Sequence, residues 1–86
     1  YVLSKQLLRS GTSIGANVEE AGAAQSRKDF LPKMSIASKE ARETRYWLQL
    51  LQESGLVDVD VGRELELVDE LIRILTSIVK TTGENL

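Results

Sequence analysis

The sequence predicts an all-α fold, an up-down antiparallel helical bundle in which three long helices are visible. Apolar residues recur at steps of three and four along most of the chain, which is the spacing of one face of a helix. The 86 residues contain only one proline, and the joints between the periodic segments are short. Short joints make consecutive helices antiparallel. We therefore expect a single domain, residues 1–86, with helices at about 1–24, 27–54 and 59–82.

The first expected helix contains two glycines, Gly11 and Gly15, in its middle. Each glycine costs up to about 1 kcal/mol relative to alanine in a helix, and the neighbouring serines, threonine and asparagine also favour other conformations. We expect close packing by other helices against these small residues to offset the cost, because a small-xxx-small spacing lets helices approach closely. Gly22 marks the end of the helix, with Ala23 and Ala24 continuing it. The expected core stripe is Leu3, Leu7, Ile14 and Val18, flanked by Leu8.

The second expected helix begins at a capping sequence and ends at a glycine. Ser26 is placed to cap it, with Asp29 in the capping-box position, and Gly55 is placed to stop it. Pro32 lies beyond the first turn, so we expect a local irregularity there. One apolar seam consists of Phe30, Met34, Ala37, Ala41, Leu48 and Leu51, with Thr44 in line, and a second, flanking face consists of Ile36, Trp47 and Leu50.

The third expected helix is capped by Asp58 or Asp60 and closed by Gly83. Its apolar stripe is wide and consists of Leu65, Val68, Leu71, Ile72, Ile74, Leu75, Ile78 and Val79. Two of the three helices are thus apolar over more than one stripe. A fourth helix, either upstream in the chain or from another copy, would cover the remainder.

Composition excludes several classes of protein. The chain has no cysteine and no histidine, so it lacks the commonest general base and metal ligands. A di-iron centre in a bundle needs Glu-x-x-His pairs, and the serines have no evident activating base. We therefore expect no catalytic site, cofactor or metal. Charges interrupt every apolar run and no signal peptide is present, which predicts a cytoplasmic protein without a membrane span.

One group of polar residues is expected to meet between the first two helices. Two interpretations remain for it: a polar pocket for a ligand, or a network of hydrogen bonds and ion pairs that fixes the register of the helices. We favour the structural network. Its members are Arg9, Ser10, Ser13, Asn17, Glu20, Glu40 and Glu43.

A second group of residues makes the middle of the chain mildly basic, although the formal net charge is −2 and the last third is acidic. In an oligomer each copy would contribute these cations, and together they would form a basic band that contacts nucleic acid. Tyr46 and Trp47 would then be a platform on which bases stack. The alternative, which we favour, is a solvated face with ordinary ion pairs such as Lys39–Glu43, and Trp47 packed inside the bundle or at an interface. The cations are Arg27, Lys28, Lys33, Lys39, Arg42 and Arg45.

Two runs of sequence resemble a known family. Residues 4–21 read SKQLLRSGTSIGANVEEA, and Asp29-Phe30 is followed at residues 35–48 by SIASKEARETRYWL. These runs resemble the four-helix-bundle family encoded in 23S rRNA intervening sequences. The resemblance implies that the first of four helices precedes Tyr1 and that the protein forms ring-shaped homopentamers. A related group within this fold serves as nucleic-acid-binding accessory proteins of retroelement reverse transcriptases.

These observations lead to two functional hypotheses. The first is a non-enzymatic, oligomeric helical-bundle protein that acts through self-assembly and partner binding, with itself as its principal partner. The alternative is an RNA- or DNA-binding accessory protein. Because the chain opens with Tyr1 inside a helical pattern, we also expect upstream residues to be missing from it.

Overall fold

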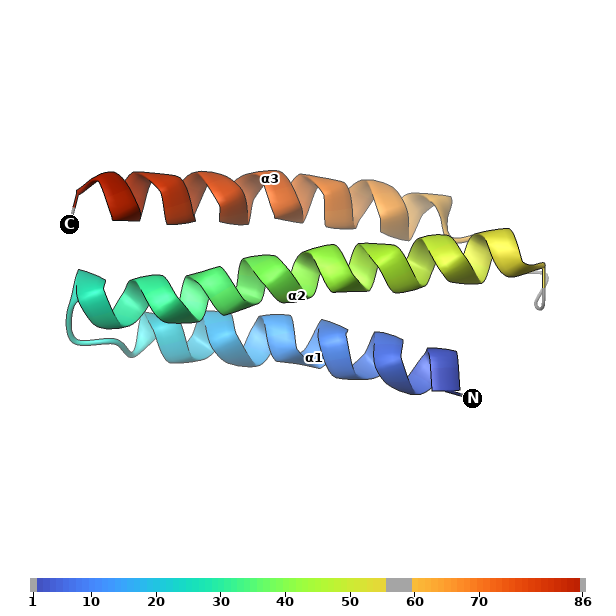
Figure 1. The fold of residues 1–86 in the computed structure, drawn as a ribbon, viewed down its shortest axis with the longest axis horizontal. Helices are drawn as coiled ribbons and strands as arrows, with labels where there is room; N and C mark the ends of the chain where they lie inside the picture. Colours follow the sequence, from blue (N-terminus) through green and yellow to red (C-terminus); the bar gives the residue numbers. More distant parts are fainter. Residues whose placement is uncertain (1, 56–59, 86) are drawn as a thin grey trace.

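Three helices form the structure, a computed structural model that describes residues 2–55 and 60–85. Helix α1 comprises Val2–Gly22, α2 comprises Arg27–Ser54 and α3 comprises Gly62–Glu84. They lie side by side with α2 in the middle, and consecutive helices run in opposite directions (Figure 1). The described residues contain no strand. The all-α prediction is therefore confirmed for this part of the chain.

The arrangement is a thin layer. Its principal extents are 45, 20 and 13 Å. Helices α1 and α3 each pack against α2, and within the described ranges no Cα atom of α1 lies within 8 Å of a Cα atom of α3. Helix α2 thus has neighbours on two sides, whereas each outer helix has only one.

Local sequence signals set the limits of α2. The backbone N–H of Asp29 donates to the Ser26 hydroxyl at 3.1 Å, as expected for an N-cap. Gly55 ends the helix in the left-handed conformation with a φ of 68°. The expected irregularity at Pro32 does not interrupt the helix, which continues through that residue. Because proline has no N–H, the carbonyl of Lys28 lacks its usual intrahelical donor.

The other helix limits differ from the prediction by a few residues. Helix α1 ends at Gly22 instead of residue 24, and the N–H of Ala24 turns back to the carbonyl of Ala21. Helix α3 continues past Gly83 to Glu84, since nothing there requires a left-handed residue.

The start of α3 also differs from the expected one. The helix starts at Gly62, whose N–H donates to the carboxylate of Asp60 at 2.9 Å. Asp60 therefore acts one residue before the N-cap position, which Val61 occupies. The expected start at residue 59 and the alternative cap Asp58 lie outside the described residues.

Two apolar clusters hold the layer together. The larger cluster joins all three helices and consists of Ile14, Ala21, Met34, Ala37, Ala41 and Leu75. The smaller lies at the other end and consists of Leu48, Val61 and Val68, with Leu7, Leu51 and Leu65 packed against it. Both Ala37 and Ala41 are completely buried. Small residues on α2 therefore permit the close approach of its neighbours.

The expected packing role of the glycines is wrong for the contact between α1 and α2. A Cβ atom added at Gly11 or Gly15 would meet no atom outside its own stretch of helix within 4 Å. Val18, expected in the core stripe, is 40% exposed. The side of α1 that faces α2 instead carries Ser10 and Ile14. The glycines lie on a different side because they are about 100° or more around the helix from Ser10.

We expect Gly55→Ala to lower the free energy of unfolding by about 1–2 kcal/mol, because an alanine in the left-handed conformation brings its Cβ too close to the next carbonyl. Gly83→Ala is the matched control, since Gly83 lies within α3 and a Cβ there meets nothing. Urea unfolding of both variants measures the difference. An equal effect of the two substitutions would contradict the assignment of Gly55 as the conformational stop.

Candidate functional site

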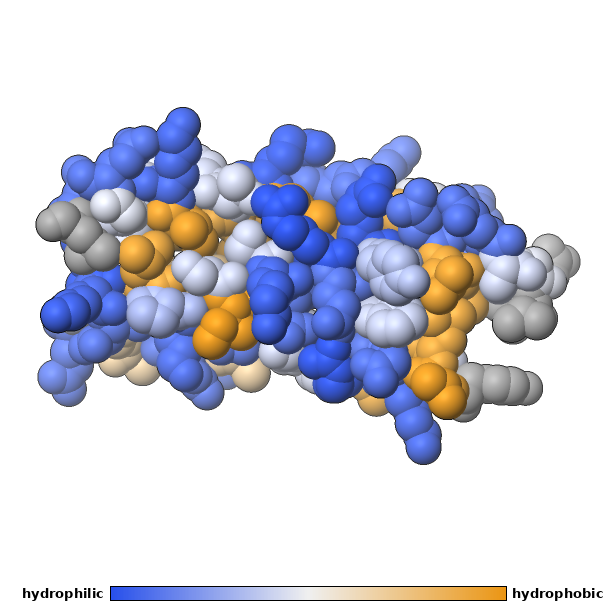
Figure 2. All heavy atoms as spheres, viewed as in Figure 1, coloured by the Kyte–Doolittle hydropathy of each residue, from blue (hydrophilic) through white to orange (hydrophobic). Residues whose placement is uncertain are grey.

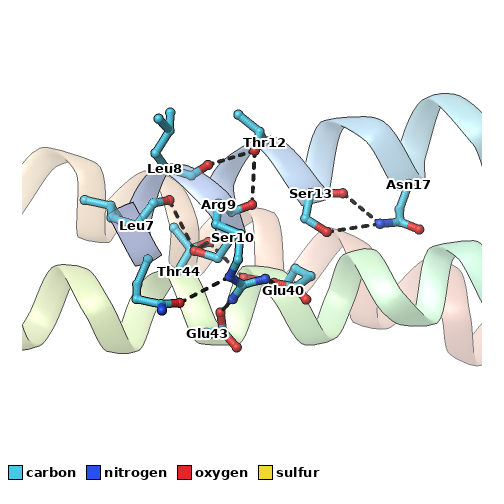
Figure 3. Close-up of polar contacts among 11 residues, drawn as sticks. Leu7, Leu8, Arg9, Ser10, Thr12, Ser13, Asn17, Glu40, Glu43 and Thr44 are labelled. Atoms are coloured by element: carbon cyan, nitrogen blue, oxygen red, sulfur yellow. Dashed lines mark hydrogen bonds and ion pairs between the residues drawn. The ribbon is translucent and has the colours of Figure 1, made fainter. Parts of the chain in front are cut away.

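Arg9 of α1 is the centre of a charged cluster with two carboxylates of α2 (Figure 3). Its guanidinium pairs with Glu40 at 3.4 Å and with Glu43. Its Nε also donates to Gln6 at 3.2 Å. The Glu40 residue is only 6% exposed, whereas the Arg9 side chain is half exposed. The cluster thus places one carboxylate inside the protein and supplies its counter-charge from the surface.

A buried hydroxyl pair lies next to this cluster. The Thr44 hydroxyl is 2.9 Å from the Ser10 hydroxyl and 2.8 Å from the carbonyl of Glu40. The Ser10 hydroxyl in turn reaches the carbonyl of Leu7 at 3.2 Å. Ser10 is fully buried and Thr44 nearly so. Buried hydroxyls need such partners, and the pair links α1 to α2 at a defined position.

The remaining members of the expected polar group do not join the cluster. The Asn17 amide donates to the carbonyl and hydroxyl of Ser13, both within α1 (Figure 3). Glu20 pairs with Lys33 at 2.6 Å on the exposed surface. The structure therefore brings together Arg9, Glu40 and Glu43 but leaves Ser13, Asn17 and Glu20 apart from them. Neither of the two pockets described below is lined by a residue of this cluster.

The six candidate nucleic-acid contacts do not form one patch. Arg27 donates to the backbone carbonyl of Asn85, and Lys33 pairs with Glu20. Arg42 donates to Thr76 at 2.9 Å, and Arg45 pairs with Asp69 at 2.6 Å. These four side chains therefore bind other parts of the same chain.

The two remaining cations are Lys28 and Lys39, which are exposed and have no polar partner in the described part of the chain. The expected pair Lys39–Glu43 is wrong, because Glu43 binds Arg9 instead.

The two adjacent aromatic residues differ in their surroundings. Tyr46 is 58% exposed, and Trp47 is partly buried. Their rings meet edge to face with centroids 5.1 Å apart, a favourable aromatic geometry. The indole Nε1 of Trp47 is buried and has no acceptor among the described residues.

Three further features of the described residues bear on function. No three carboxylates gather as metal ligands there. A shallow pocket of about 420 Å³ lies between the α1–α2 joint and the end of α3, with Ala21, Phe30 and Thr82 among its lining residues. It has no pairing of a nucleophile with a base. None of the described helices combines the length and apolarity that a membrane span requires.

Three contacts of the site were not expected from the sequence. The sequence pattern puts Thr44 in line with the apolar seam, whereas in the structure its hydroxyl donates to the hydroxyl of Ser10. Gln6 supports Arg9, and Asp69 holds Arg45. The position of Thr44 in line with Ala37, Ala41 and Leu48 is the signal in the sequence, since a buried hydroxyl needs a partner, either in its own helix or on the facing one.

We expect Arg9→Met to lower the free energy of unfolding by about 1–3 kcal/mol, because it leaves the buried Glu40 carboxylate without its cation. The double variant Arg9→Met/Glu40→Met should lose less, since it removes both charges together. Arg63→Met on the exposed side of α3 is the control. Chemical unfolding measures all three. A double variant that is less stable than Arg9→Met would contradict this account.

Comparison with known proteins identifies the family of the chain. Residues 1–77 match the family described as 23S rRNA-intervening sequence protein. A similar solved structure is a protein of unknown function of the S23 ribosomal protein family from Bacteroides thetaiotaomicron VPI-5482. It is 49% identical, with a TM-score of 0.79, and the match covers 93% of this chain and 75% of that one. No curated protein matches the chain. The chain belongs to the 23S rRNA-intervening sequence protein family.

Proposed function

We propose that this protein is a non-enzymatic helical-bundle protein that acts through self-assembly and partner binding, and that its principal partner is another copy of itself. One observation carries the proposal. The outer face of α2, which we define as Ile36, Tyr46, Trp47 and Leu50, is apolar or aromatic, and all of these residues except Trp47 are exposed.

The composition of this outer face is that of an interface. Ile36 and Leu50 are each 38% exposed, and Tyr46 is more so. Aromatic residues are enriched in protein–protein contacts. A small hollow of about 140 Å³ lies between Tyr46, Gln49, Leu50 and Glu53, which is room for part of one side chain. A broad face of the layer also carries apolar patches towards both ends, separated by hydrophilic residues (Figure 2).

The thinness of the layer supports the same proposal. At 86 residues, a domain buries a modest share of its surface and is marginally stable alone. A layer in which, over the described residues, no Cα atom of α1 lies within 8 Å of one of α3 buries even less. We propose that the complete fold is an up-down four-helix bundle whose first helix precedes residue 1, and that its copies associate in the cytoplasm.

A ring of five copies is the assembly that the family resemblance implies, and we propose it here. Ring closure needs a heterologous contact, in which one surface of a copy meets a different surface of the next. The outer face of α2 would supply one of the two surfaces. Its rim carries both signs of charge, with Lys39 and Glu53 exposed, which favours a specific orientation of the neighbour.

Nucleic-acid binding is the alternative function, and fewer residues support it. Only Lys28 and Lys39 of the six candidate cations lack a polar partner in the described part of the chain. Repetition of these two lysines around a ring would still produce a basic band. A titration with RNA and DNA at several salt concentrations tests it. We expect little affinity, whereas tight binding that weakens steeply with salt would favour the alternative.

We expect Leu50→Glu to reduce the solution mass of the natural full-length protein to that of smaller species, because a buried carboxylate at an interface has no counter-charge. Ser77→Glu, on an exposed position of α3, adds the same charge elsewhere and is the control. Light scattering after size exclusion measures the mass. An unchanged oligomer in Leu50→Glu, or a monomeric parent protein, would contradict the proposal.

A further inference from the structure

Four exposed residues follow the side of α1 that lies about 120–180° around the helix from the buried Ile14. Lys5, Leu8, Thr12 and Glu19, which we call the α1 row, are separated by three, four and seven residues. All four are exposed, and Leu8 is 69% exposed. Within the described residues, the side chains of Lys5 and Glu19 have no polar partner. The α1 row thus has an unpaired cation near one end, an unpaired anion at the other and an uncovered leucine between them.

A matching row follows the outer side of α2. It consists of Lys39, Tyr46, Leu50 and Glu53, and we call it the α2 row. All four residues are exposed, and Tyr46, Leu50 and Glu53 line the small hollow described above. The separations are seven, four and three residues. This is the spacing of the α1 row in reverse order, and the row combines part of the outer face of α2 with its charged rim.

The two rows are complementary when they run antiparallel. Each begins with a lysine and ends with a glutamate fourteen residues later, which is about 21 Å at 1.5 Å per residue. An antiparallel alignment therefore brings a lysine opposite a glutamate at both ends, whereas a parallel alignment brings like charges together. The facing pairs are Lys5 with Glu53, Leu8 with Leu50, Thr12 with Tyr46, and Glu19 with Lys39.

The rows cannot meet within one copy. Helices α1 and α2 contact each other through other sides, which carry Ser10, Ile14 and Thr44. Each row lies on the exposed surface of its own helix. Because both halves of the complementary pattern belong to the same chain, a second copy supplies the partner that each row matches.

We propose that the α1 row of one copy packs antiparallel against the α2 row of the next copy, with Leu8 at the hollow beside Tyr46 and Leu50. This inference rests on the proposed self-assembly and assigns the second surface of its contact. Because the two rows differ, the contact is heterologous, and each copy uses each row once, as in a ring.

The heights of the two rows suit a closed ring. Within one copy, Ser10 of α1 lies opposite Thr44 of α2. From that level Leu8 lies about 3 Å, and Leu50 about 9 Å, towards the same end of the layer. Copies related by rotation about an axis parallel to the helices stay at the same height. The two rows are therefore about 6 Å out of step, or one helical turn, and a tilt of each copy against the ring axis aligns them.

Engineered disulfides test the contact in the natural full-length protein, with any upstream cysteine replaced by serine, because residues 1–86 contain none. We expect Leu8→Cys/Leu50→Cys to form covalent species up to the full ring under mild oxidation, since facing positions bring Cα atoms to the roughly 4–7 Å that a disulfide needs. Each single variant should stay unlinked. Non-reducing electrophoresis measures the products.

Leu8→Cys/Ile36→Cys is the matched control for this register. Ile36 is as exposed as Leu50 and belongs to the same outer face, but it lies fourteen residues away, about 21 Å along the helix. We expect no covalent species from this pair. Linking in either single variant, or equal linking in the control pair, would overturn the proposed contact.

A charge exchange tests the antiparallel alignment independently. We expect Lys5→Glu to raise by about tenfold the protein concentration needed for half assembly, because two carboxylates then face each other. Lys5→Glu/Glu53→Lys should restore assembly. Lys80→Glu, at an exposed position of α3, makes the same charge change elsewhere and is the control. Light scattering over a dilution series measures the effect, and a double variant no better than Lys5→Glu would contradict the alignment.

The outcomes separate this contact from self-assembly itself. An oligomeric parent that Leu50→Glu dissociates, together with an unlinked Leu8→Cys/Leu50→Cys, would leave self-assembly standing and refute only the role of the α1 row. A monomeric parent would refute both.

Discussion

The rest of the structure depends on the close contact between α1 and α2. This contact combines fully buried alanines at positions 37 and 41 with the hydroxyl pair of Ser10 and Thr44. Small residues allow the backbones to approach. Each hydroxyl also has a carbonyl partner in its own helix, and the bond between the two hydroxyls adds a directional contact that favours one mutual position of α1 and α2. The charged cluster around Arg9 lies at the same level of the two helices. It adds an electrostatic preference for the same register.

Helix α2 is the only element that both of the others contact, and this explains the exposed surfaces. A helix with apolar residues on two sides can organise a layer, but a layer leaves the far sides of its outer members uncovered. Exposed apolar residues therefore remain on α1 and α3 as well as on the outer face of α2. The outer face is aromatic with a charged rim, which suits a separate subunit.

The candidate site is best understood as part of this architecture. Its charges are paired with one another, its hydroxyls are satisfied, and most of the expected basic surface is bound to neighbouring helices. Such an arrangement stabilises a particular packing of α1 against α2. The self-assembly proposed above therefore rests on the exposed apolar surfaces and not on this cluster.

The sequence by itself determined the helical class, the limits of α2 and the two-sided character of that helix. These features depend on local signals, namely apolar periodicity, the Ser26 cap and the left-handed Gly55. It also indicated that Arg9 and the α2 glutamates would meet. Only the tertiary structure decided that the Thr44 hydroxyl donates to Ser10, that the Asn17 amide bonds within its own helix, and that Gly11 and Gly15 face away from α2. The reason is rotational: spacing shows which residues share a face of a helix, but the direction of that face depends on the neighbouring helices.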